Sequence, residues 1–521
     1  MKRTLGLTLG VAAILASRVT AQLPYKNPAL PLDVRVHDLI RRMTLEEKFW
    51  QLFMIPGGRA DSAADYSHGA FGLQNRSATN AKTDAQLQNS LQHYFVDSTR
   101  LGIPIIPFEE AVHGVMRSGA MVYPAAIALA ATFDSGLVRE VASAIAREAR
   151  TRGIRQVLSP VVNLATDVRW GRVEETYGED PVLASVMARA FVGPFERQGV
   201  IATPKHFVAN VGEGGRDSYP IDVDERTLEE LFYPPFRAAI VDAGAGSVMT
   251  AYNSVDGTPA SQNRALLDKT LRRDWHFKGF IISDQAAVGG AVVLHHTEAN
   301  TASAAKHALE AGLDVIFQSE YRQYRPWLAA FRSGAIAPNV IDSAVARVLR
   351  AKFALGLFEH PYVDPDSAAA WQDNAESRSL AREAARKSVV LLQNHAGTLP
   401  LSSTVASVAV IGTDAAEPRL GGYTLDSARG VSILDGLRAR FGDRVRYAPG
   451  PGRSGEEYAV VPEQNLDSLR GEYFDNITLS GPPRLTRDDE NIDFHWTFNA
   501  PSRGLQIGWY SVRWTGRLEA P

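Results

Sequence analysis

An aspartate at the end of an apolar run is the strongest candidate for chemistry in this sequence. Gly279 is followed by the apolar run 280–282, by Ser283 and by Asp284. A short run bounded in this way is typical of a parallel strand that is covered on both faces. In barrels of such strands the chemistry lies at the carboxyl ends, so we interpret Asp284 as a carboxylate nucleophile. The alternative is a structural role, as the cap of the next helix.

Polar side chains follow four other apolar runs in the same way. They are Glu109, Glu110 and His113 after 103–108; Arg169, Trp170 and Arg172 after 156–158; Lys205 and His206 after 200–203; and Tyr252 and Asn253 after 247–250. Charged groups form strong hydrogen bonds to hydroxyls, and a tryptophan offers a face for sugar C–H groups. Together these side chains favour a pocket for a polyhydroxylated ligand.

Each of these residues also has a structural interpretation. Glu110 could pair with an arginine, Lys205 could be a solvated surface charge, and Trp170 could belong to the hydrophobic core. Only the convergence of several such residues on one face of the fold makes the functional interpretation the stronger one.

Several other classes of site are disfavoured. His295 and His296 are adjacent, not three or four residues apart, and we therefore expect no metal site. No G-x-G-x-x-G follows the first strand, so no dinucleotide cofactor is expected. The formal net charge of −3 offers no basic surface for nucleic acid or a membrane. The sequence has no cysteine, which excludes disulfides and thiolate chemistry.

The elements that must position these residues alternate along residues 22–361. Apolar runs recur about every 30 to 50 residues, at 52–55, 103–108, 156–158, 200–203, 247–250, 279–282 and 314–316. Segments of helical periodicity lie between them, for example 137–151 and 302–311. This alternation predicts an α/β fold, and we favour a TIM-like (β/α)8 barrel over a doubly wound sheet.

Two smaller regions follow the predicted barrel. After a linker at 362–385, residues 386–468 show a helix ending at 387, a strand at 405–412, a helix at 433–441 and a strand at 445–447, which predicts a partial α/β sandwich domain. From 469 to 521 the sequence is rich in aromatic residues and alternates with turn residues, which predicts an all-β module.

The N-terminus has the pattern of a secretory signal peptide at residues 1–21. Lys2 and Arg3 precede an apolar run at 5–16, and Val19 and Ala21 are the small residues before the expected cleavage site. The run is shorter than the roughly 20 apolar residues that span a bilayer. We therefore expect a periplasmic or secreted protein; an uncleaved anchor is the alternative.

The polar motifs closely resemble those of glycoside hydrolase family 3. The resemblance rests on five segments, in the order and spacing of that family: 109–114 (EEAVHG), 167–181 (DVRWGRVEETYGEDP), 205–207 (KHF), 249–253 (MTAYN) and 279–284 (GFIISD). It extends over about residues 25 to 450.

This resemblance implies a retaining exo-acting β-glucosidase that acts on β-linked oligosaccharides or glycosides. Asp284 would form the covalent glycosyl-enzyme intermediate. By the same resemblance, the residues that hold the sugar at the cleaved bond are Glu110, Arg172, Lys205, His206 and Tyr252.

Two positions depart from the family's usual pattern. Family β-glucosidases usually have Asp at the position of Glu110, whereas many β-xylosidases have Glu, so β-xylosidase remains the alternative activity. Gln285 stands where the family usually has Trp or Tyr after the nucleophile, so the aromatic wall of the sugar site is either weakened or supplied from elsewhere.

The general acid/base is the residue that the sequence leaves unassigned. The region from 469 resembles the opening strands of a protective-antigen-type β-sandwich, a module that some β-glucosidases insert into the second domain ahead of the acid/base Glu. We therefore expect the module to be truncated and the acid/base to lie outside this sequence. The retaining mechanism needs two carboxyl groups about 5 Å apart, and Glu174, Glu179 and Glu213 are the alternatives within this sequence, although no motif supports that role for any of them.

Two activities of other classes stay open. Lys205 could form a Schiff base in a barrel aldolase, although His206 and Arg172 nearby disfavour this. The protein could also bind sugars without catalysis, if Asp284 is chemically inert.

Overall fold

The structure, a computed structural model, describes residues 23–57, 65–75, 78–211, 220–425, 428–450, 460–494, 496, 500–502, 504–505 and 510–519. The predicted signal peptide lies outside these residues.

Eight short strands of the first region follow one another in a ring. They are β1 (Phe53–Pro56), β2 (Leu73–Gln74), β3 (Phe108–Glu109), β4 (Gln156–Val157), β5 (Ile201–Ala202), β6 (Ser247–Met249), β9 (Phe280–Ile282) and β10 (Ile316–Phe317). Parallel ladders join β10–β1–β2, β3–β4–β5 and β6–β9.

Backbone hydrogen bonds join the ends of these ladders. Ile106 N donates to Phe71 O between β2 and β3, Phe207 N donates to Met249 O between β5 and β6, and Ser283 N donates to Val315 O between β9 and β10. Because β10 pairs in turn with β1, the order is that of a TIM-like barrel and not of an open doubly wound sheet.

Each of the seven predicted apolar runs contains or adjoins a strand of this ring, and only β2 was missed. Leu73–Gln74 is too short to give a periodic signal. Its position depends on Gly72, where a Cβ atom would lie 1.8 Å from the carbonyl oxygen of Ile106. The close approach of two backbones therefore selects glycine there.

Helices cover the outside of the ring. They are α1 (Leu32–Arg42), α2 (Leu45–Gln51), α3 (Ala81–Ser98), α4 (Ala126–Ala130), α5 (Ser135–Thr151), α6 (Pro181–Arg197), α7 (Glu225–Thr227), α8 (Tyr233–Arg237), α9 (Ala287–Val293), α10 (Thr301–Ala311), α11 (Tyr324–Arg332) and α12 (Pro338–Ala354). Helix α5 shows how the sequence produces such a helix. Asp134 caps its N-terminus by accepting from Leu137 N, and Val138, Val141 and Ile145 on one face are fully buried.

Shorter elements connect these helices and strands. π-helical segments lie at η4 (Leu228–Phe232), η5 (Ala238–Asp242) and η7 (Ala265–Asp274), and β7 (Ser254–Val255) and β8 (Thr258–Pro259) form a hairpin. Short 3₁₀ turns lie at η1 (Pro24–Lys26), η2 (Val168–Trp170), η3 (Val173–Glu175), η6 (Ala260–Gln262) and η8 (Tyr321–Gln323).

The second region is a small α/β unit. It contains α13 (Pro365–Trp371), α14 (Ala375–Ser388), β11 (Val408–Ile411), α15 (Ile433–Phe441) and β12 (Val445–Ala448), and β11 pairs with β12 in parallel. Two more 3₁₀ turns, η10 (Thr413–Ala415) and η11 (Gly442–Arg444), flank these strands, and η9 (His395–Gly397) precedes them. The predicted helices and strands are thus confirmed. The apolar residues 389–392 after α14 form no strand and are exposed.

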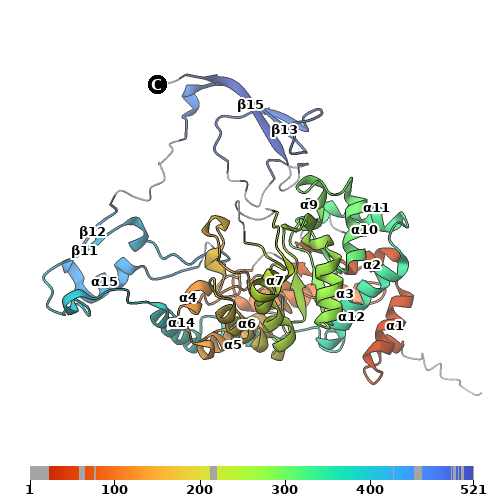
Figure 1. The fold of residues 1–521 in the computed structure, drawn as a ribbon, viewed down its shortest axis with the longest axis horizontal. Helices are drawn as coiled ribbons and strands as arrows, with labels where there is room; N and C mark the ends of the chain where they lie inside the picture. Colours follow the sequence, from red (N-terminus) through yellow and green to blue (C-terminus); the bar gives the residue numbers. More distant parts are fainter. Residues whose placement is uncertain are drawn as a thin grey trace, which may run out of the picture.

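The third region is antiparallel. Strand β13 (Leu466–Phe474) lies between β14 (Leu485–Asp488) and β15 (Ser511–Leu518), after the short turn η12 (Glu463–Asn465). Figure 1 shows these strands above the barrel, with β11, β12 and α15 to the left beside α4 and α14. The all-β character is confirmed, and the domain boundaries at 361 and 468 stay predictions.

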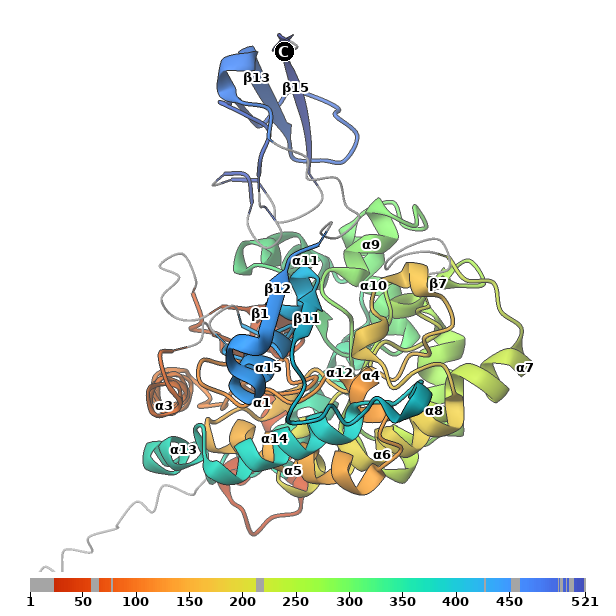
Figure 2. The ribbon, with the colours of Figure 1, turned by 90° about the vertical axis from the view of Figure 1, so that its left-hand side faces the viewer.

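Figure 2 shows the fold from the side of α15 and β12, with β13 and β15 again above the barrel. Within the described ranges, no helix is long and apolar enough to cross a membrane.

Candidate active site

The carboxyl ends of neighbouring parallel strands bring the predicted residues together. Asp284 follows β9, Lys205 and His206 follow β5, and Glu110 follows β3. Arg172 lies after β4, between η2 and η3. Because these strands run in parallel around one ring, all of these side chains project from the same end of the barrel.

Asp284 is buried, and its two carboxylate oxygens have different neighbours. Its side chain Oδ1 accepts a hydrogen bond of 2.7 Å from Gln285 N, and its Oδ2 lies 3.5 Å from His206 Nε2. The residue is 8% exposed. One oxygen of the carboxylate is therefore fixed by the backbone, and the other faces His206.

The orientation of the His206 ring is set by Asn163. Asn163 Oδ1 accepts from the backbone N of His206 at 2.7 Å and lies 3.0 Å from His206 Nδ1. Since this oxygen can only accept, Nδ1 carries a proton, and in the neutral ring Nε2 accepts from Arg172 Nη2 at 3.1 Å. Asn163 was not predicted from the sequence, and no motif singled it out.

Arg172 is held by a carboxylate that sequence reasoning also missed. Its Nε and Nη2 donate to the two oxygens of Glu175, at 2.8 Å each. The spacing of three residues was a signal that this pair could form within one turn. Trp170 is fully buried, with its ring centroid 5.7 Å from the Arg172 guanidinium, so it is a core residue and not a sugar platform.

Lys205 and Glu110 form a buried ion pair. Lys205 Nζ donates to both carboxylate oxygens of Glu110, at 2.9 Å each. Burial lowers the pKa of Lys205, but the Glu110 carboxylate, with smaller contributions from Tyr423 and Glu175, raises it, and the pKa is raised overall. Burial also raises the pKa of Glu110 to about 7, against the opposing charge of Lys205.

A raised lysine pKa bears on the aldolase alternative. A Schiff-base lysine must be able to lose its proton near neutral pH. Lys205 is held as an ammonium by Glu110, so the geometry disfavours that chemistry.

Tyr423, from the second region, contacts both the Arg172–Glu175 pair and the Lys205–Glu110 pair. Its phenol oxygen accepts from Arg172 Nη2 at 3.2 Å, and Lys205 Nζ lies 4.7 Å from its ring centroid. Burial raises the pKa of Tyr423 to about 12, with Lys205 opposing, so the phenol keeps its proton. Sequence reasoning did not find Tyr423, because it lies in an irregular loop more than 200 residues from its contacts.

The loop that carries Tyr423 is fixed to the barrel through its backbone. Gly422 N donates to Glu174 Oε1 at 2.8 Å, and Gly422 O lies 2.8 Å from His113 Nε2. A Cβ atom at position 422 would lie 2.9 Å from Glu174 Oε1. A larger residue at this position would have to displace the Glu174 carboxylate that binds Gly422 N.

The remaining predicted residues are less closely tied to this group. Tyr252 follows β6, the neighbour of β9, and its carbonyl accepts from His295 Nε2 at 2.9 Å. Glu174 and Glu179 are exposed, and Glu213 lies outside the described residues. In the described part of the chain, no three His, Cys, Asp or Glu side chains are grouped so as to hold a metal ion.

One cavity lies near this site, and one groove lies away from it. A cavity of about 560 Å³ begins at Ala286 and Gly289, close to Asp284, and extends past Trp327 to Asn476 and Leu505 of the third region. Asp284 and the other predicted site residues do not line it.

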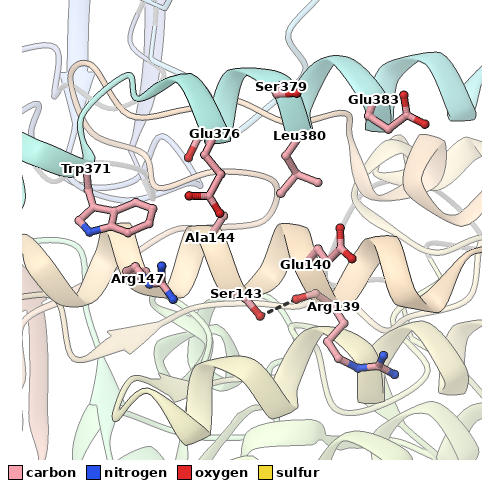
Figure 3. Close-up of a pocket in the computed structure, with 11 residues that line it drawn as sticks. Arg139, Glu140, Ser143, Ala144, Arg147, Trp371, Glu376, Ser379, Leu380 and Glu383 are labelled. Carbon is pink, nitrogen blue, oxygen red and sulfur yellow. Dashed lines mark hydrogen bonds between the residues drawn. The ribbon is translucent and has the colours of Figure 1, made fainter.

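The groove, of about 620 Å³, lies between α5 and α14 on the outside of the barrel (Figure 3). Arg139, Glu140 and Arg147 line it from α5, and Glu376 and Glu383 from α14. None of the predicted site residues lines it.

Comparison with known proteins gives a family for both main regions. The family model described as "Glycosyl hydrolase family 3 N terminal domain" matches residues 44–351. The model described as "Glycosyl hydrolase family 3 C-terminal domain" matches residues 389–497. A periplasmic beta-glucosidase of Salmonella typhimurium is 34% identical, over 85% of this chain and 60% of its own length. A beta-xylosidase of Formosa agariphila is 36% identical, over 71% of this chain and 56% of its own length.

Solved structures agree with these matches. A β-glucosidase from Erythrobacter marinus has a TM-score of 0.76 and 35% identity, covering 82% of this chain and 60% of that chain. A β-glucosidase from Listeria innocua, solved with laminaribiose, has a TM-score of 0.71 and 31% identity, covering 80% of this chain and 60% of that chain. The chain thus spans about 60% of the length of these relatives.

The likeness covers the residues that form the site as well as the strands that position them. The matched segment 44–351 contains Glu110, Arg172, Lys205, His206 and Asp284. The chain belongs to glycoside hydrolase family 3.

Proposed function

We propose that the protein acts as a retaining exo-β-glucosidase, with Asp284 as the nucleophile. One observation carries the proposal: a buried carboxylate, with one oxygen held by Gln285 N, lies beside His206, Arg172 and the Lys205–Glu110 pair at the strand ends of a barrel. This group offers a nucleophile and several strong hydrogen-bonding partners for hydroxyls at one end of the barrel.

In the proposed reaction, Asp284 Oδ2 attacks the anomeric carbon and the bond to the leaving group breaks. Water then attacks the same carbon and releases Asp284, which retains the β configuration. The Gln285 N–H keeps Oδ1 in place during both steps. Lys205, Glu110, Arg172 and His206 hold the sugar hydroxyls, Tyr252 supports the nucleophile, and a sugar bound among these buried groups is excluded from bulk water.

The general acid/base is proposed to lie outside this sequence. Glu174 is bonded to Gly422 N, which commits it to the contact between the two regions. Substrates with good leaving groups need little protonation and are therefore expected to react in the first step without this residue.

β-Xylosidase is the second candidate, because position 110 is Glu. A glutamate reaches one methylene further into the pocket than an aspartate and leaves less room for the hydroxymethyl group of glucose. The similarity to the Formosa agariphila beta-xylosidase supports the same alternative.

A covalent labelling experiment tests the proposal. The protein is incubated with dinitrophenyl 2-deoxy-2-fluoro-β-glucoside or the matching xyloside, and the adduct is mapped by mass spectrometry. We expect a single adduct on Asp284, no adduct on Asp284→Asn, and unchanged labelling of Asp256→Asn, an exposed aspartate in a turn. A folded protein that takes no adduct would rule out the nucleophile and favour a non-catalytic sugar-binding role.

We also propose a periplasmic or secreted location. The proposal rests on the pattern of residues 1–21 and on the periplasmic beta-glucosidase among the relatives. Detection of a mature N-terminus at residue 22 in the exported protein would test it.

A further inference from the structure

A chain of buried charges lies directly behind Glu110, and the proposed reaction does not use it. It runs from Glu109 through Arg117, Asp84 and Arg152 to Glu148. The side chains of all five residues are at most 7% exposed. Burying five charges costs free energy unless each is paired with an opposite charge. A role in the fold or in the site would account for such a chain of charges.

The end of this chain nearest the site is bonded to the backbone of Glu110. Glu109 Oε1 accepts from Glu110 N at 2.9 Å and from Gln74 Nε2 at 2.5 Å, and Glu109 Oε2 lies 2.6 Å from Arg117 Nε. The Glu109 carboxylate is thus held by β2 and by Arg117, and it holds Glu110 in turn.

The other main-chain group of Glu110 is held as well. Glu110 O accepts from Met116 N at 2.9 Å, so the loop from 110 to 117 closes on itself next to Arg117. With both backbone groups fixed, the point from which the Glu110 side chain reaches Lys205 is fixed as well. An error of about 1 Å at such a contact is enough to cost binding.

We propose that Arg117 is a positioning residue of the sugar site. Through Glu109 it fixes the backbone of Glu110, and so the place where Glu110 and Lys205 meet a sugar hydroxyl. The inference rests on the proposed function, in which Glu110 binds the sugar. The far end of the charge chain acts elsewhere, because Arg152 joins Asp84 on α3 to Glu148 on α5, at 2.9 Å each, and ties the two helices together.

A double-mutant cycle of Arg117→Met and Glu110→Ala tests this positioning role, with the labelling of Asp284 as the measurement. The concentration dependence of Asp284 labelling gives an inhibition constant, which reports sugar binding, and a limiting rate, which reports the chemical step. We expect Arg117→Met to raise the inhibition constant about fivefold or more and to change the limiting rate less than about twofold. In a Glu110→Ala background, Arg117→Met should change the inhibition constant less than about twofold.

Arg152→Met is the matched control. It removes an arginine that is equally buried in the same chain of charges, but one that does not touch Glu109. We expect it to lower the unfolding temperature and to leave the inhibition constant within about twofold. Equal effects of Arg117→Met and Arg152→Met, or effects of Arg117→Met and Glu110→Ala that simply multiply, would overturn the proposal.

Two further measurements keep the test decisive. If Arg117→Met does not fold, Glu109→Gln keeps the shape of the side chain and removes the charge that pairs with Arg117. The effect of Glu109→Gln on the inhibition constant must also vanish in the Glu110→Ala background. If the wild-type protein takes no label, the proposed function fails, and the same cycle is measured by calorimetric binding of isofagomine. A cycle without coupling in that measurement would overturn the role of Arg117 by itself.

Discussion

The phenol oxygen of Tyr423 lies 3.2 Å from Arg172 Nη2, although the two residues belong to different regions of the chain. Tyr423 also covers Lys205 with its ring. The proposed sugar site is therefore not a property of the barrel alone. Gln285 stands where the resemblance predicts an aromatic residue, and Tyr423 offers an aromatic ring beside Lys205 and Arg172.

Two substitutions of Tyr423 distinguish its hydrogen bond to Arg172 from its ring contact with Lys205. Tyr423→Phe keeps the ring over Lys205 and loses the hydrogen bond to Arg172, and we expect a twofold to tenfold rise in the inhibition constant of the fluoroglycoside. Tyr423→Ala loses both contacts and should have the larger effect. Tyr447→Phe, on β12 of the same region, is the control and should behave as wild type. Equal behaviour of all three variants would show that Tyr423 does not contribute to the sugar site.

A second prediction concerns the choice between glucose and xylose. Glu110→Asp shortens the side chain by one methylene and gives up part of the twofold contact with Lys205. We expect the ratio of glucoside to xyloside labelling to rise by about tenfold, since one methylene in a pocket is worth about 1–3 kcal/mol of discrimination. The ratio is insensitive to the fraction of folded protein. An unchanged ratio would show that position 110 does not set the sugar preference.

The parts of this site that could be predicted are those that the strands determine. Asp284, Lys205, His206 and Glu110 each follow an apolar run, and parallel strands of one ring end on the same side. The runs themselves were visible because strands covered on both faces are continuously apolar. Sequence spacing was therefore enough to predict which side chains converge.

The parts that could not be predicted depend on contacts between distant segments. Tyr423 and Asn163 reach the site from irregular backbone, which has no periodicity to read. Arg117 and Asp84 lie in no motif of the sequence, and their burial and pairing are visible only in the structure. Trp170 was ambiguous for the same reason, since burial is decided by its neighbours.

A third prediction concerns stability against pH. Glu196, at the end of α6, accepts from Ala202 N and Gly246 N through the same oxygen, Oε1, at 2.8 Å each. Burial raises the pKa of Glu196 to about 7, against the two backbone hydrogen bonds. The folded protein therefore binds a proton more tightly than the unfolded chain. This stabilises the fold below the ordinary glutamate pKa, and the contribution is lost as the pH rises to about 7.

Glu196→Gln keeps Oε1 as the acceptor and removes the titration. We expect wild type to lose about 1–2 kcal/mol of stability relative to Glu196→Gln between pH 4.5 and pH 8. Urea unfolding followed by tryptophan fluorescence measures the difference. Glu140→Gln, on the exposed face of α5, is the control. A pH dependence that is the same in wild type and Glu196→Gln would contradict the assignment.

A close backbone contact in the barrel gives the last prediction. A Cβ atom at Gly72 would lie 1.8 Å from the carbonyl oxygen of Ile106, so a larger residue would push β2 away from β3. We expect Gly72→Ala to lower the free energy of unfolding by about 3 kcal/mol or more, measured by urea denaturation. Gly289→Ala in α9, where the nearest atom would be 3.9 Å away, should stay within about 1 kcal/mol of wild type. Gln74 on β2 donates a hydrogen bond to Glu109, so we expect Gly72→Ala to weaken sugar binding as well. A variant with the stability and the sugar binding of wild type would show that β2 can shift without cost.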